Sequence, residues 1–392
     1  MDASSRLRIL VLGYVVRGPI AGHTWPMLQF TLGLARLGHE VRFLEDSEDY
    51  PLCYDPLRDE IGVDPSCGLE YAAGVFGRAG LGDRWAYHDA HRGEWRGPGA
   101  ARALEWCAGA DLLINVSGLN PIRPWLERVP RRIYVDLDPA FDQVRQSGDP
   151  VWRARARGHD AFFTVGENIA AGTARVPDLG ITWQAVRQPI VLDLWPVTPV
   201  PAGARFTTLL QWDSYATREW EGMRLGMKSE SFPEFFELPS RSRVAFDLAL
   251  VAPDAARDRL LRHGWGIVDP GPISRDPWTY QRFIQSSRGE WTVAKHGYVR
   301  SRCGWFSERS AQYLASGRPV ITQETGFSNH LPTGDGLFAF STMDEALAAL
   351  EEVARREEHH RRAARELAVE HFDSDRVLAG MLERALGSRG AT

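Results

Sequence analysis

The chain has 392 residues, of which 44% are hydrophobic and 25% charged, as is usual for a globular protein. This length is too great for one ordinary core and suits two α/β domains. The formal net charge of −5, without a basic tail, argues against nucleic acid or an anionic membrane surface as a partner.

No run of about 18 apolar residues is present to span a bilayer, and the N-terminus leads into an expected strand rather than a secretory signal. The four cysteines (Cys53, Cys67, Cys107 and Cys303) lack the clustering that a disulfide framework or a zinc site requires. We therefore expect a cytoplasmic protein with reduced thiols and no integral membrane contact. The sequence specifies no oligomeric state.

The first half of the chain has the rhythm of a parallel α/β unit. Residues 8–13 are an apolar run ending in glycine, residues 25–37 have an amphipathic helical pattern, and Gly38 precedes a strand over 40–44. Further strands are expected at 111–116, 132–136 and 161–165. The alternation predicts a doubly wound parallel sheet within residues 1–195.

The second half repeats this rhythm after a proline-rich linker at 196–204. Strands are expected at 205–211, 246–251, 265–268, 291–294, 320–323 and 336–340, within a domain of residues 205–370. Residues 371–392 form a last helix, separated from the preceding helix by a break near Phe372. Two doubly wound, Rossmann-like domains with facing strand ends predict a central cleft.

The segment from Lys295 to Glu308 is the strongest candidate for a phosphate site. A strand ends near Ala294, and a glycine-containing loop leads into a helix that starts at about Ser307, a fair N-cap. The positive end of that helix favours a diphosphate, and Lys295 and Arg302 add positive charge nearby. The alternative is a solvated basic loop before an ordinary helix.

Lysine is nearly absent from the chain. Of the 46 basic residues only Lys228 and Lys295 are lysines. A compact ammonium retained at two positions in an arginine-rich chain suggests a need that a planar guanidinium does not meet. For Lys228 alone, a surface charge on a helix explains the residue equally well.

These motifs resemble the donor-binding stretch of GT-B glycosyltransferases. The plant branch has His-Cys-Gly-Trp-Asn-Ser followed by a Glu and Gly-x-Pro, and here residues 302–307 read Arg-Cys-Gly-Trp-Phe-Ser, followed by Glu308 and Gly-Arg-Pro at 317–319. The chain is also similar over nearly its whole length to bacterial glycosyltransferases that carry Gly-Trp-Phe-Ser and Gln-Asp-Thr-Gly-Phe. The resemblance implies the GT-B fold and a nucleoside-diphosphate sugar as substrate, with no cofactor.

The resemblance also implies a donor site, with Glu308 accepting hydrogen bonds from the ribose. Related enzymes pack the nucleobase after the third strand of this half, where a plain turn is the alternative. The retaining families' Glu-x7-Glu pattern would place acids at Gly304 and Gln312, and neither is acidic. The implied donor and phosphate contacts are Gln211, Trp212, Lys228, Lys295, Arg302, Gly304, Ser307, Glu308, Glu324, Thr325 and Gly326, and the implied nucleobase contacts are Trp265, Val268 and Asp269.

A catalytic base is implied in the first half. Residues 22–28 resemble the Gly-His-x-x-Pro-x-Leu of inverting GT-B enzymes, whose histidine deprotonates the acceptor, so the resemblance assigns that role to His23. The unperturbed pKa of an imidazole, close to neutral pH, suits this task. No aspartate follows the strand at 111–116, so Asp136 or Asp138 would orient His23, or it works without a carboxylate. The residues expected to line the cleft are Gly22, Glu167, Asn168 and Arg187.

The predicted function is a metal-independent, inverting glycosyltransferase that acts on an unidentified small-molecule or glycan acceptor. The final helix is expected to cross back to the first domain, as in relatives. A nucleotide-sugar 2-epimerase of the same fold and a non-catalytic nucleotide-sugar-binding protein are the alternatives. A nicotinamide dehydrogenase fits least, because Gly13, Gly18 and Gly22 do not have GxGxxG spacing.

Overall fold

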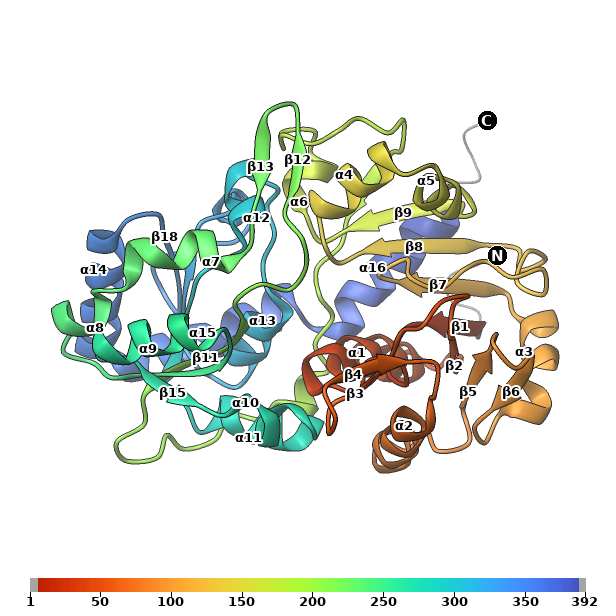
Figure 1. Ribbon diagram of the computed structural model, residues 1–392, viewed down its shortest axis with the longest axis horizontal. Helices are drawn as coiled ribbons and strands as arrows, with labels where there is room; N and C mark the ends of the chain where they lie inside the picture. Colours follow the sequence, from red (N-terminus) through yellow and green to blue (C-terminus); the bar gives the residue numbers. More distant parts are fainter. Residues whose placement is uncertain (1–5, 388–392) are drawn as a thin grey trace.

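The computed structural model describes residues 6–387 and has two α/β halves, each built on its own sheet (Figure 1). The N-terminal sheet has the order β10-β9-β8-β7-β1-β2-β5-β6 and is parallel except where the edge strand β6 pairs with β5. Its strands are β1 (Arg8–Leu12), β2 (Glu40–Asp46), β5 (Trp85–Asp89), β6 (Glu94–Arg96), β7 (Leu112–Val116), β8 (Arg132–Asp136), β9 (Ala161–Thr164) and β10 (Trp183–Ala185).

The C-terminal sheet is parallel throughout, with the order β15-β14-β11-β16-β17-β18. In each sheet the strand order reverses beside the first strand, between β1 and β7 and between β11 and β16. Ligands of doubly wound sheets bind outside the carboxyl ends of the strands at such a reversal. The strands are β11 (Phe206–Gln211), β14 (Phe246–Val251), β15 (Gly266–Val268), β16 (Gly289–Thr292), β17 (Val320–Gln323) and β18 (Leu337–Phe340).

Helices connect the parallel strands of both halves. Helix α1 begins at Ala21, four residues before the predicted start, because the carbonyl of Ile20 already accepts from the amide of Thr24 (3.0 Å). His23 therefore lies in its first turn. The other helices are α2 (Ser66–Arg78), α3 (Ala103–Gly109), α4 (Phe141–Gly148), α5 (Pro150–Arg157), α6 (Glu167–Ala170), α7 (Lys228–Ser231), α8 (Leu238–Arg241), α9 (Asp254–Arg262), α10 (Pro270–Ser274), α11 (Pro277–Gln285), α12 (His296–Ser301), α13 (Glu308–Ala315), α14 (Met343–Arg355), α15 (Glu357–His371) and α16 (Ser374–Gly387), with α1 ending at Arg36.

Two short antiparallel hairpins stand apart from the sheets. The strands β3 (Cys53–Asp55) and β4 (Glu60–Gly62) form one, and β12 (Arg218–Trp220) and β13 (Met223–Leu225) form the other. The backbone amide of Tyr54 donates to the carbonyl of Arg17 (3.0 Å), which ties the first hairpin to the loop after β1. In Figure 1 the second hairpin rises between the two halves.

The loop after β1 folds around a buried carboxylate. Glu45 Oε2 accepts from the amides of Val15 (2.6 Å) and Val16 (2.8 Å), and its Oε1 accepts from the amide of Arg17 (2.6 Å). In a dinucleotide-binding fold the corresponding loop and the helix that follows it hold a pyrophosphate. Here a side chain from the neighbouring strand β2 fills that position.

The chain passes from one sheet to the other through residues 196–204, which contain no helix or strand. This linker is held against the second half by Arg318, a fully buried side chain whose guanidinium donates to the carbonyls of Thr198 (3.0 Å) and Pro199 (3.3 Å). Gln285 adds a hydrogen bond to the Pro196 carbonyl (3.1 Å). The linker therefore follows the surface of the second half rather than hanging free.

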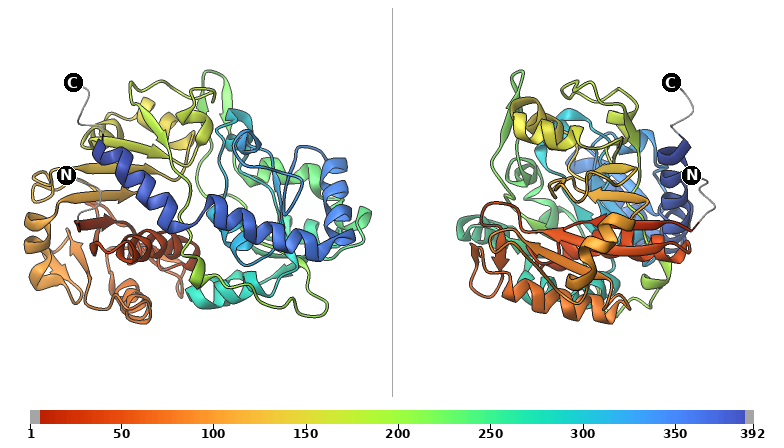
Figure 2. Two further views of the ribbon diagram at one scale, coloured as in Figure 1. Left: turned by 180° about the vertical axis from the view of Figure 1, so that it is seen from behind. Right: turned by 90° about the vertical axis from the view of Figure 1, so that its right-hand side faces the viewer.

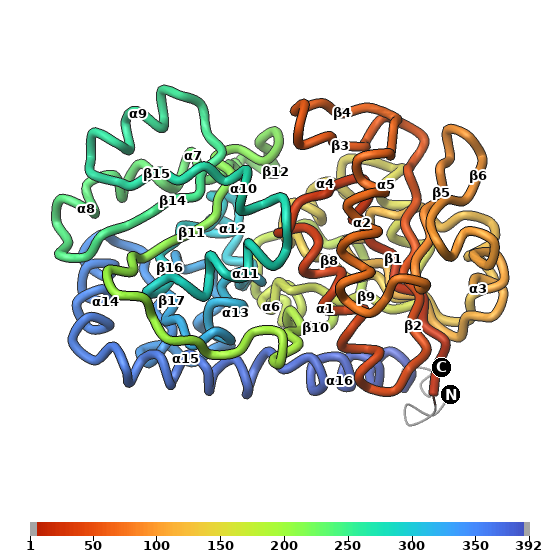
Figure 3. The backbone as a smooth tube through the Cα atoms, turned by 90° about the horizontal axis from the view of Figure 1, so that it is seen from below, coloured from red at the N-terminus to blue at the C-terminus, as the bar shows by residue number. Residues whose placement is uncertain are grey.

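The last helix returns to the first half. Figure 2 shows α16 lying across the back of the N-terminal half, and Figure 3 shows α15 and α16 running along one side of the molecule from one half to the other. Between them, the Ile190 amide donates to the Phe372 carbonyl (2.7 Å) and the Ser374 amide donates to the Ile190 carbonyl (2.9 Å). Arg131 Nε donates to the Ala385 carbonyl near the end of α16 (2.8 Å).

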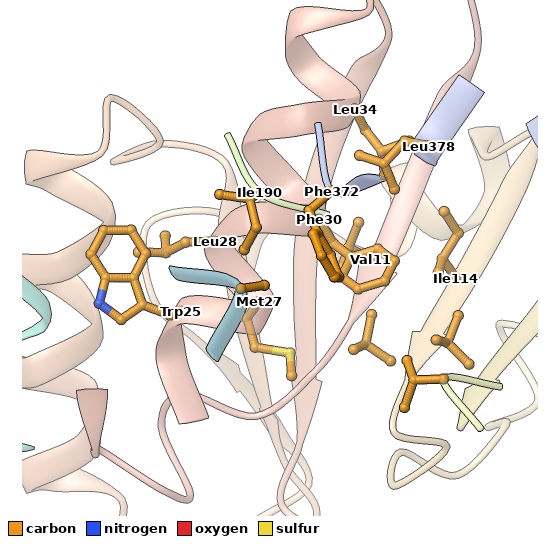
Figure 4. Packing of buried hydrophobic residues seen from close by; sticks show 14 of the residues in the cluster. Val11, Trp25, Met27, Leu28, Phe30, Leu34, Ile114, Ile190, Phe372 and Leu378 are labelled. Carbon is orange, nitrogen blue, oxygen red and sulfur yellow. The ribbon is translucent and has the colours of Figure 1, made fainter. Parts of the chain in front are cut away.

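The apolar face of α1 is packed between the N-terminal sheet and α16. Phe30 and Leu34 of α1 lie in one buried cluster with Val11 of β1, Phe372 and Leu378 (Figure 4). A Cβ atom at Gly33 would lie 2.5 Å from Leu378 Cδ1 and 3.0 Å from Ser374 Cβ, so a larger residue there would displace the Leu378 side chain. The same cluster continues into the second half through α13, so the core is shared.

Several polar contacts also join the halves. Trp25 Nε1 donates to the Pro277 carbonyl (3.0 Å), Asn168 Nδ2 donates to the Arg302 carbonyl (2.8 Å), and Lys295 Nζ lies 3.1 Å from Asp138 Oδ1. One buried apolar cluster also contains residues of both halves, among them Phe141 of α4 and Met223 of the β12–β13 hairpin. Within residues 6–387, no helix combines the length and the hydropathy needed to cross a bilayer.

Candidate active site

A cavity of about 440 Å³ lies between the two halves, at the carboxyl ends of both sheets. Its first wall comes from the loop after β1, the start of α1 and the β3–β4 hairpin, and its second from β11, β14, α10 and the start of α13. The lining includes Tyr14, Gly22, His23, Tyr54, Pro56, Leu137 and Gln188 from the first half, and Gln211, Val251, Gly271, Arg275, Tyr280, Ser307, Glu308, Arg309 and Gln312 from the second.

The start of α13 forms one end of the cavity. Ser307 is its N-cap residue, and within residues 6–387 the amides of Glu308, Arg309 and Ser310 have no hydrogen-bond acceptor. Free amides and the helix dipole make this end attractive to an anion. The turn that leads there uses Gly304 at φ 79°, where a Cβ atom would lie 2.7 Å from the amide nitrogen of Asn168.

Lys228 is at the start of α7 and is not among the residues that line the cavity, but the amide of the next residue, Ser229, donates to the Trp212 carbonyl just after β11 (3.2 Å). Lys228 is 8% exposed, and its ammonium makes no hydrogen bond or ion pair with any residue between 6 and 387. Burial, and then the charges of Arg309 and Lys295, lower the pKa of Lys228 well below the ordinary lysine value. A buried cation among other cations is costly unless an anion joins it.

The two neighbouring cations are both held by protein groups. Arg309 donates through Nε to Glu290 (2.5 Å) and through Nη1 to the Leu209 carbonyl (2.7 Å), which fixes its guanidinium at the edge of the cavity. Lys295 donates to Asp138 (3.1 Å) and to the hydroxyl of Tyr215 (2.6 Å). Lys228 is thus the cation of this group that lacks a partner.

Glu308 and Gln312, one turn apart on α13, present polar atoms to the cavity. Gln312 Nε2 donates to Glu308 Oε1 (2.9 Å), and Gln312 Oε1 is buried without a hydrogen-bond partner among the described residues. Enclosure by the cavity walls raises the pKa of Glu308 well above its usual value. The pair can therefore both donate and accept hydrogen bonds, as binding to vicinal hydroxyls requires.

His23 faces the same cavity from the opposite wall, with its ring edge-on to Tyr14 at a centroid distance of 5.4 Å. The ring is open to cavity solvent but surrounded by both walls. This enclosure, and then the charge of Lys295, lower the pKa of His23 to about 4. The pKa near neutrality that was expected for His23 is not found, and the imidazole is neutral over the whole physiological range.

The expected carboxylate partner of His23 is not found, because both candidates are bonded elsewhere. Asp136 accepts from Gln143 Nε2 (2.9 Å) and Thr164 Oγ1 (2.8 Å) inside the first half. Asp138 accepts from Lys295, Tyr215 and Tyr298 of the second half. The prediction that either one orients His23 is therefore wrong, and Asp138 is a contact between the halves.

The predicted aromatic contacts also lie outside the cavity. Trp265 is 2% exposed, packs in the core of the second half, and donates from Nε1 to the Phe236 carbonyl (2.9 Å). Trp212 is buried in the same core against Phe232. Both rings pack among the other aromatic side chains of this core. Neither ring therefore reaches a nucleobase or a phosphate.

Other predicted residues lie beside the cavity without lining it. Asp269 caps α10 by accepting from the Gly271 amide (2.9 Å), and Val268 is partly buried one residue earlier, whereas the cavity touches the segment from Pro270 to Arg275 that follows. Arg302 is exposed in a left-handed turn (φ 49°). Thr325 donates to the Trp305 carbonyl (2.5 Å), which packs the 324–326 loop, with Glu324 and Gly326, against the turn before α13.

The remaining residues expected in the cleft fasten the two halves together. Arg187 forms an ion pair with Glu167 (2.9 Å) and donates to His330 and His371 of the second half. Asn168 bonds to the carbonyls of Arg302 (2.8 Å) and Gly326 (3.3 Å). Gly22, by contrast, lines the cavity beside His23.

Sequence reasoning did not single out Tyr14, Tyr54, Arg275 or Arg309, which line the cavity. Arg309 lies directly beside the motif at 302–308, so its position next to a helix start was a usable signal. Tyr54 and Arg275 are more than 200 residues apart in the chain, and no local pattern links them.

Two doubly wound sheets whose carboxyl ends face one cavity are the GT-B fold, as the sequence predicted. No protein-family model matches the sequence, and no curated protein matches it. Among solved structures, the chain is similar to HepE from Anabaena in complex with UDP-glucose, with a TM-score of 0.60 and 11% identity over 97% of this chain and 99% of that one.

Two further structures extend the comparison. An α-glucosyltransferase in complex with UDP has a TM-score of 0.59 and 9% identity over 97% of this chain and 100% of that one. AviGT4, a glycosyltransferase involved in avilamycin A biosynthesis, has a TM-score of 0.58 and 11% identity over 98% and 99%. At these identities the similarity establishes the fold.

Proposed function

We propose that the protein is a glycosyltransferase that uses a nucleoside-diphosphate sugar. The observation that carries this proposal is the start of α13, whose free amides and the neighbouring guanidinium of Arg309 face the cavity, with the unpartnered ammonium of Lys228 at the start of α7 as a further cation. A diphosphate supplies the missing negative charge and enough oxygens for these donors. Because structures of similar fold contain UDP or UDP-glucose, a UDP-sugar is the first donor to test.

In the proposed reaction the acceptor oxygen attacks the anomeric carbon while its proton passes to the neutral imidazole of His23. The bond from the anomeric carbon to the phosphate oxygen breaks, and the diphosphate leaves with its charge stabilised by Lys228, Arg309 and the amides of α13. Attack from the wall opposite the diphosphate inverts the anomeric centre. Glu308 and Gln312 bind the ribose hydroxyls in this scheme.

Two features bear on the metal and on the acceptor. In the Asp-Leu-Asp sequence at 136–138, the carboxylate oxygens accept hydrogen bonds from protein donors. This supports a metal-independent reaction. Some structures of the similar α-glucosyltransferase contain DNA, but a net charge of −5 disfavours a polyanion here. An acceptor panel should therefore begin with small molecules and glycans.

The first experiment is calorimetric titration of the protein with UDP. Lys228→Met removes the ammonium but keeps an unbranched chain, and we expect it to raise the Kd roughly tenfold to a hundredfold, because a charge-assisted contact contributes about 1.5–3 kcal/mol. Arg241→Met is the matched control, since Arg241 is an exposed cation on α8 paired with Asp344. Equal affinities in wild type and both variants would overturn the proposed site.

Turnover separates the proposal from its alternatives. A glycosyltransferase releases UDP from a UDP-sugar only slowly until an acceptor is added. A 2-epimerase converts the donor without an acceptor, and a binding protein shows affinity without turnover. A product that retains the anomeric configuration of the donor would contradict the inverting role of His23.

A further inference from the structure

The cavity has a compartment between the β3–β4 hairpin of the first half and α10 of the second. Tyr54 and Pro56 line it on the hairpin side, and Gly271, Ser274 and Arg275 line it on the α10 side. Because both sets of residues line the same cavity, the hairpin and α10 face each other across it.

The position of this compartment fits a nucleobase. A diphosphate at the start of α13 lies at the reversal between β11 and β16, and a nucleoside attached to it extends along the carboxyl edge of the sheet toward β14 and β15. Ala249 and Val251 of β14 and Pro270 after β15 line the cavity in that direction.

On the donor-domain side this compartment offers small side chains and backbone rather than a ring. Trp305 and Tyr280 of the second half also line the cavity, but Tyr280 is 5% exposed and Trp305 is stacked on Tyr298 (centroid distance 4.4 Å) in the turn that leads to α13. A flat base in contact with Val251 and Gly271 therefore leaves its other face toward the hairpin, where Tyr54 lies half-buried.

Tyr54 is also held in place before any ligand binds. Its amide donates to the Arg17 carbonyl (3.0 Å), and its hydroxyl donates to Asp59 Oδ1 (2.9 Å) on the turn of the same hairpin. A ring fixed at both ends loses little conformational freedom when a base stacks on it.

We infer that Tyr54 provides the platform on which the nucleobase of the donor stacks, so that the donor site is completed by the first half of the chain. This inference rests on the proposed function. It gives the β3–β4 hairpin a role in nucleotide recognition, opposite an α10 wall that consists of Gly271, Ser274 and Arg275. Nucleotide binding then links the two halves directly.

The test is titration with UDP and, separately, with inorganic pyrophosphate, in the absence of any acceptor. Loss of a stacking ring costs about 1–3 kcal/mol, so Tyr54→Ala should raise the Kd for UDP roughly fivefold to a hundredfold. Tyr54→Phe keeps the ring and loses only the hydrogen bond to Asp59, so it should stay within a few-fold of the wild-type Kd and well below that of Tyr54→Ala. Neither variant should change the affinity for pyrophosphate, which has no base.

A second variant controls for damage to the hairpin. Ile61 is directly opposite Tyr54 across the hairpin and is 66% exposed, so Ile61→Ala perturbs the same element without removing the ring. Its UDP affinity should match wild type. If Tyr54→Ala binds UDP as tightly as wild type and loses only affinity for an acceptor, Tyr54 belongs to the acceptor site and the inference is wrong. If the wild-type protein binds neither ligand, the proposed function itself fails.

Discussion

The two lysines of the chain differ in their surroundings, and the difference divides their roles. Lys295 donates hydrogen bonds to Asp138 and Tyr215. It therefore joins the two halves and adds positive charge to the electrostatic field of the cavity. Lys228 has no such partner and is 8% exposed. An anionic ligand would therefore give the ammonium of Lys228 the partner that the ammonium of Lys295 already has.

His23 is the residue on which the proposed chemistry depends. We expect His23→Ala to lower kcat by about 10²–10⁴-fold, the usual contribution of a general base, with little change in the Kd for UDP. Because the pKa of His23 is lowered to about 4, wild-type kcat/KM should not fall through its protonation until the pH drops below about 5. Steady-state rates from pH 5 to 8 check this, and loss of UDP affinity in parallel with rate would argue for a structural role.

The site residues that belong to a local sequence motif could be predicted. The sequence identified Ser307 and Glu308 because a strand, a glycine turn and a helix start follow one another there, and it identified His23 through a similar local motif. Trp265 was misplaced because a strand pattern does not say which neighbours fill a core. The partners of Asp138 come from a different half of the chain, so no spacing reveals them.

At the scale of elements, the long strands and helices followed from periodicity, whereas the hairpins did not. Strands of three residues, as in β3 and β4, are too short to show an alternating pattern. The linker was visible from its prolines, but its attachment depends on Arg318, which is far away in sequence. Helix α16 has the pattern of an ordinary amphipathic helix. The resemblance implied its return to the first domain, but its packing against α1 in the core is visible only in the structure.

The contact between α16 and α1 can be measured through one side chain. Leu378 is fully buried against Gly33, so Leu378→Ala should lower the free energy of unfolding by about 2–5 kcal/mol. Val369→Ala, at a 41% exposed position on α15, should change it by less than about 0.5 kcal/mol. Urea unfolding of wild type, Leu378→Ala and Val369→Ala measures these free energies. Similar midpoints for all three would mean that α16 adds little to the core.

At the scale of the whole molecule, contacts flank the cavity and limit how the halves can move. Trp25 bonds to Pro277 at the start of α11, and Phe141 packs edge-on against Tyr215 (5.2 Å between ring centroids) just before the β12–β13 hairpin. Asn168 bonds to the turn before α13. Asp138 belongs to the same set of contacts. Burial opposes its ionisation, but Lys295 and two tyrosine hydroxyls outweigh that effect and lower the pKa of Asp138.

The contribution of this contact can be tested without changing its shape. Asp138→Asn keeps the size of the side chain and removes its charge, and we expect it to lower the free energy of unfolding by about 1–3 kcal/mol. Asp247→Asn, which weakens an exposed pair with Arg205 inside the second half, should cost less than about 1 kcal/mol. Chemical denaturation at constant pH compares them, and an equal loss in both variants would contradict a special role for Asp138.

The carboxylate of Glu45 has a consequence for the symmetry of the molecule. The two halves repeat one architecture, but in the N-terminal half the amides of the loop after β1 donate to a carboxylate of the same chain. A second nucleotide at that loop would have to displace this carboxylate. If the proposed donor binds at the start of α13, we therefore expect one nucleotide per protein molecule.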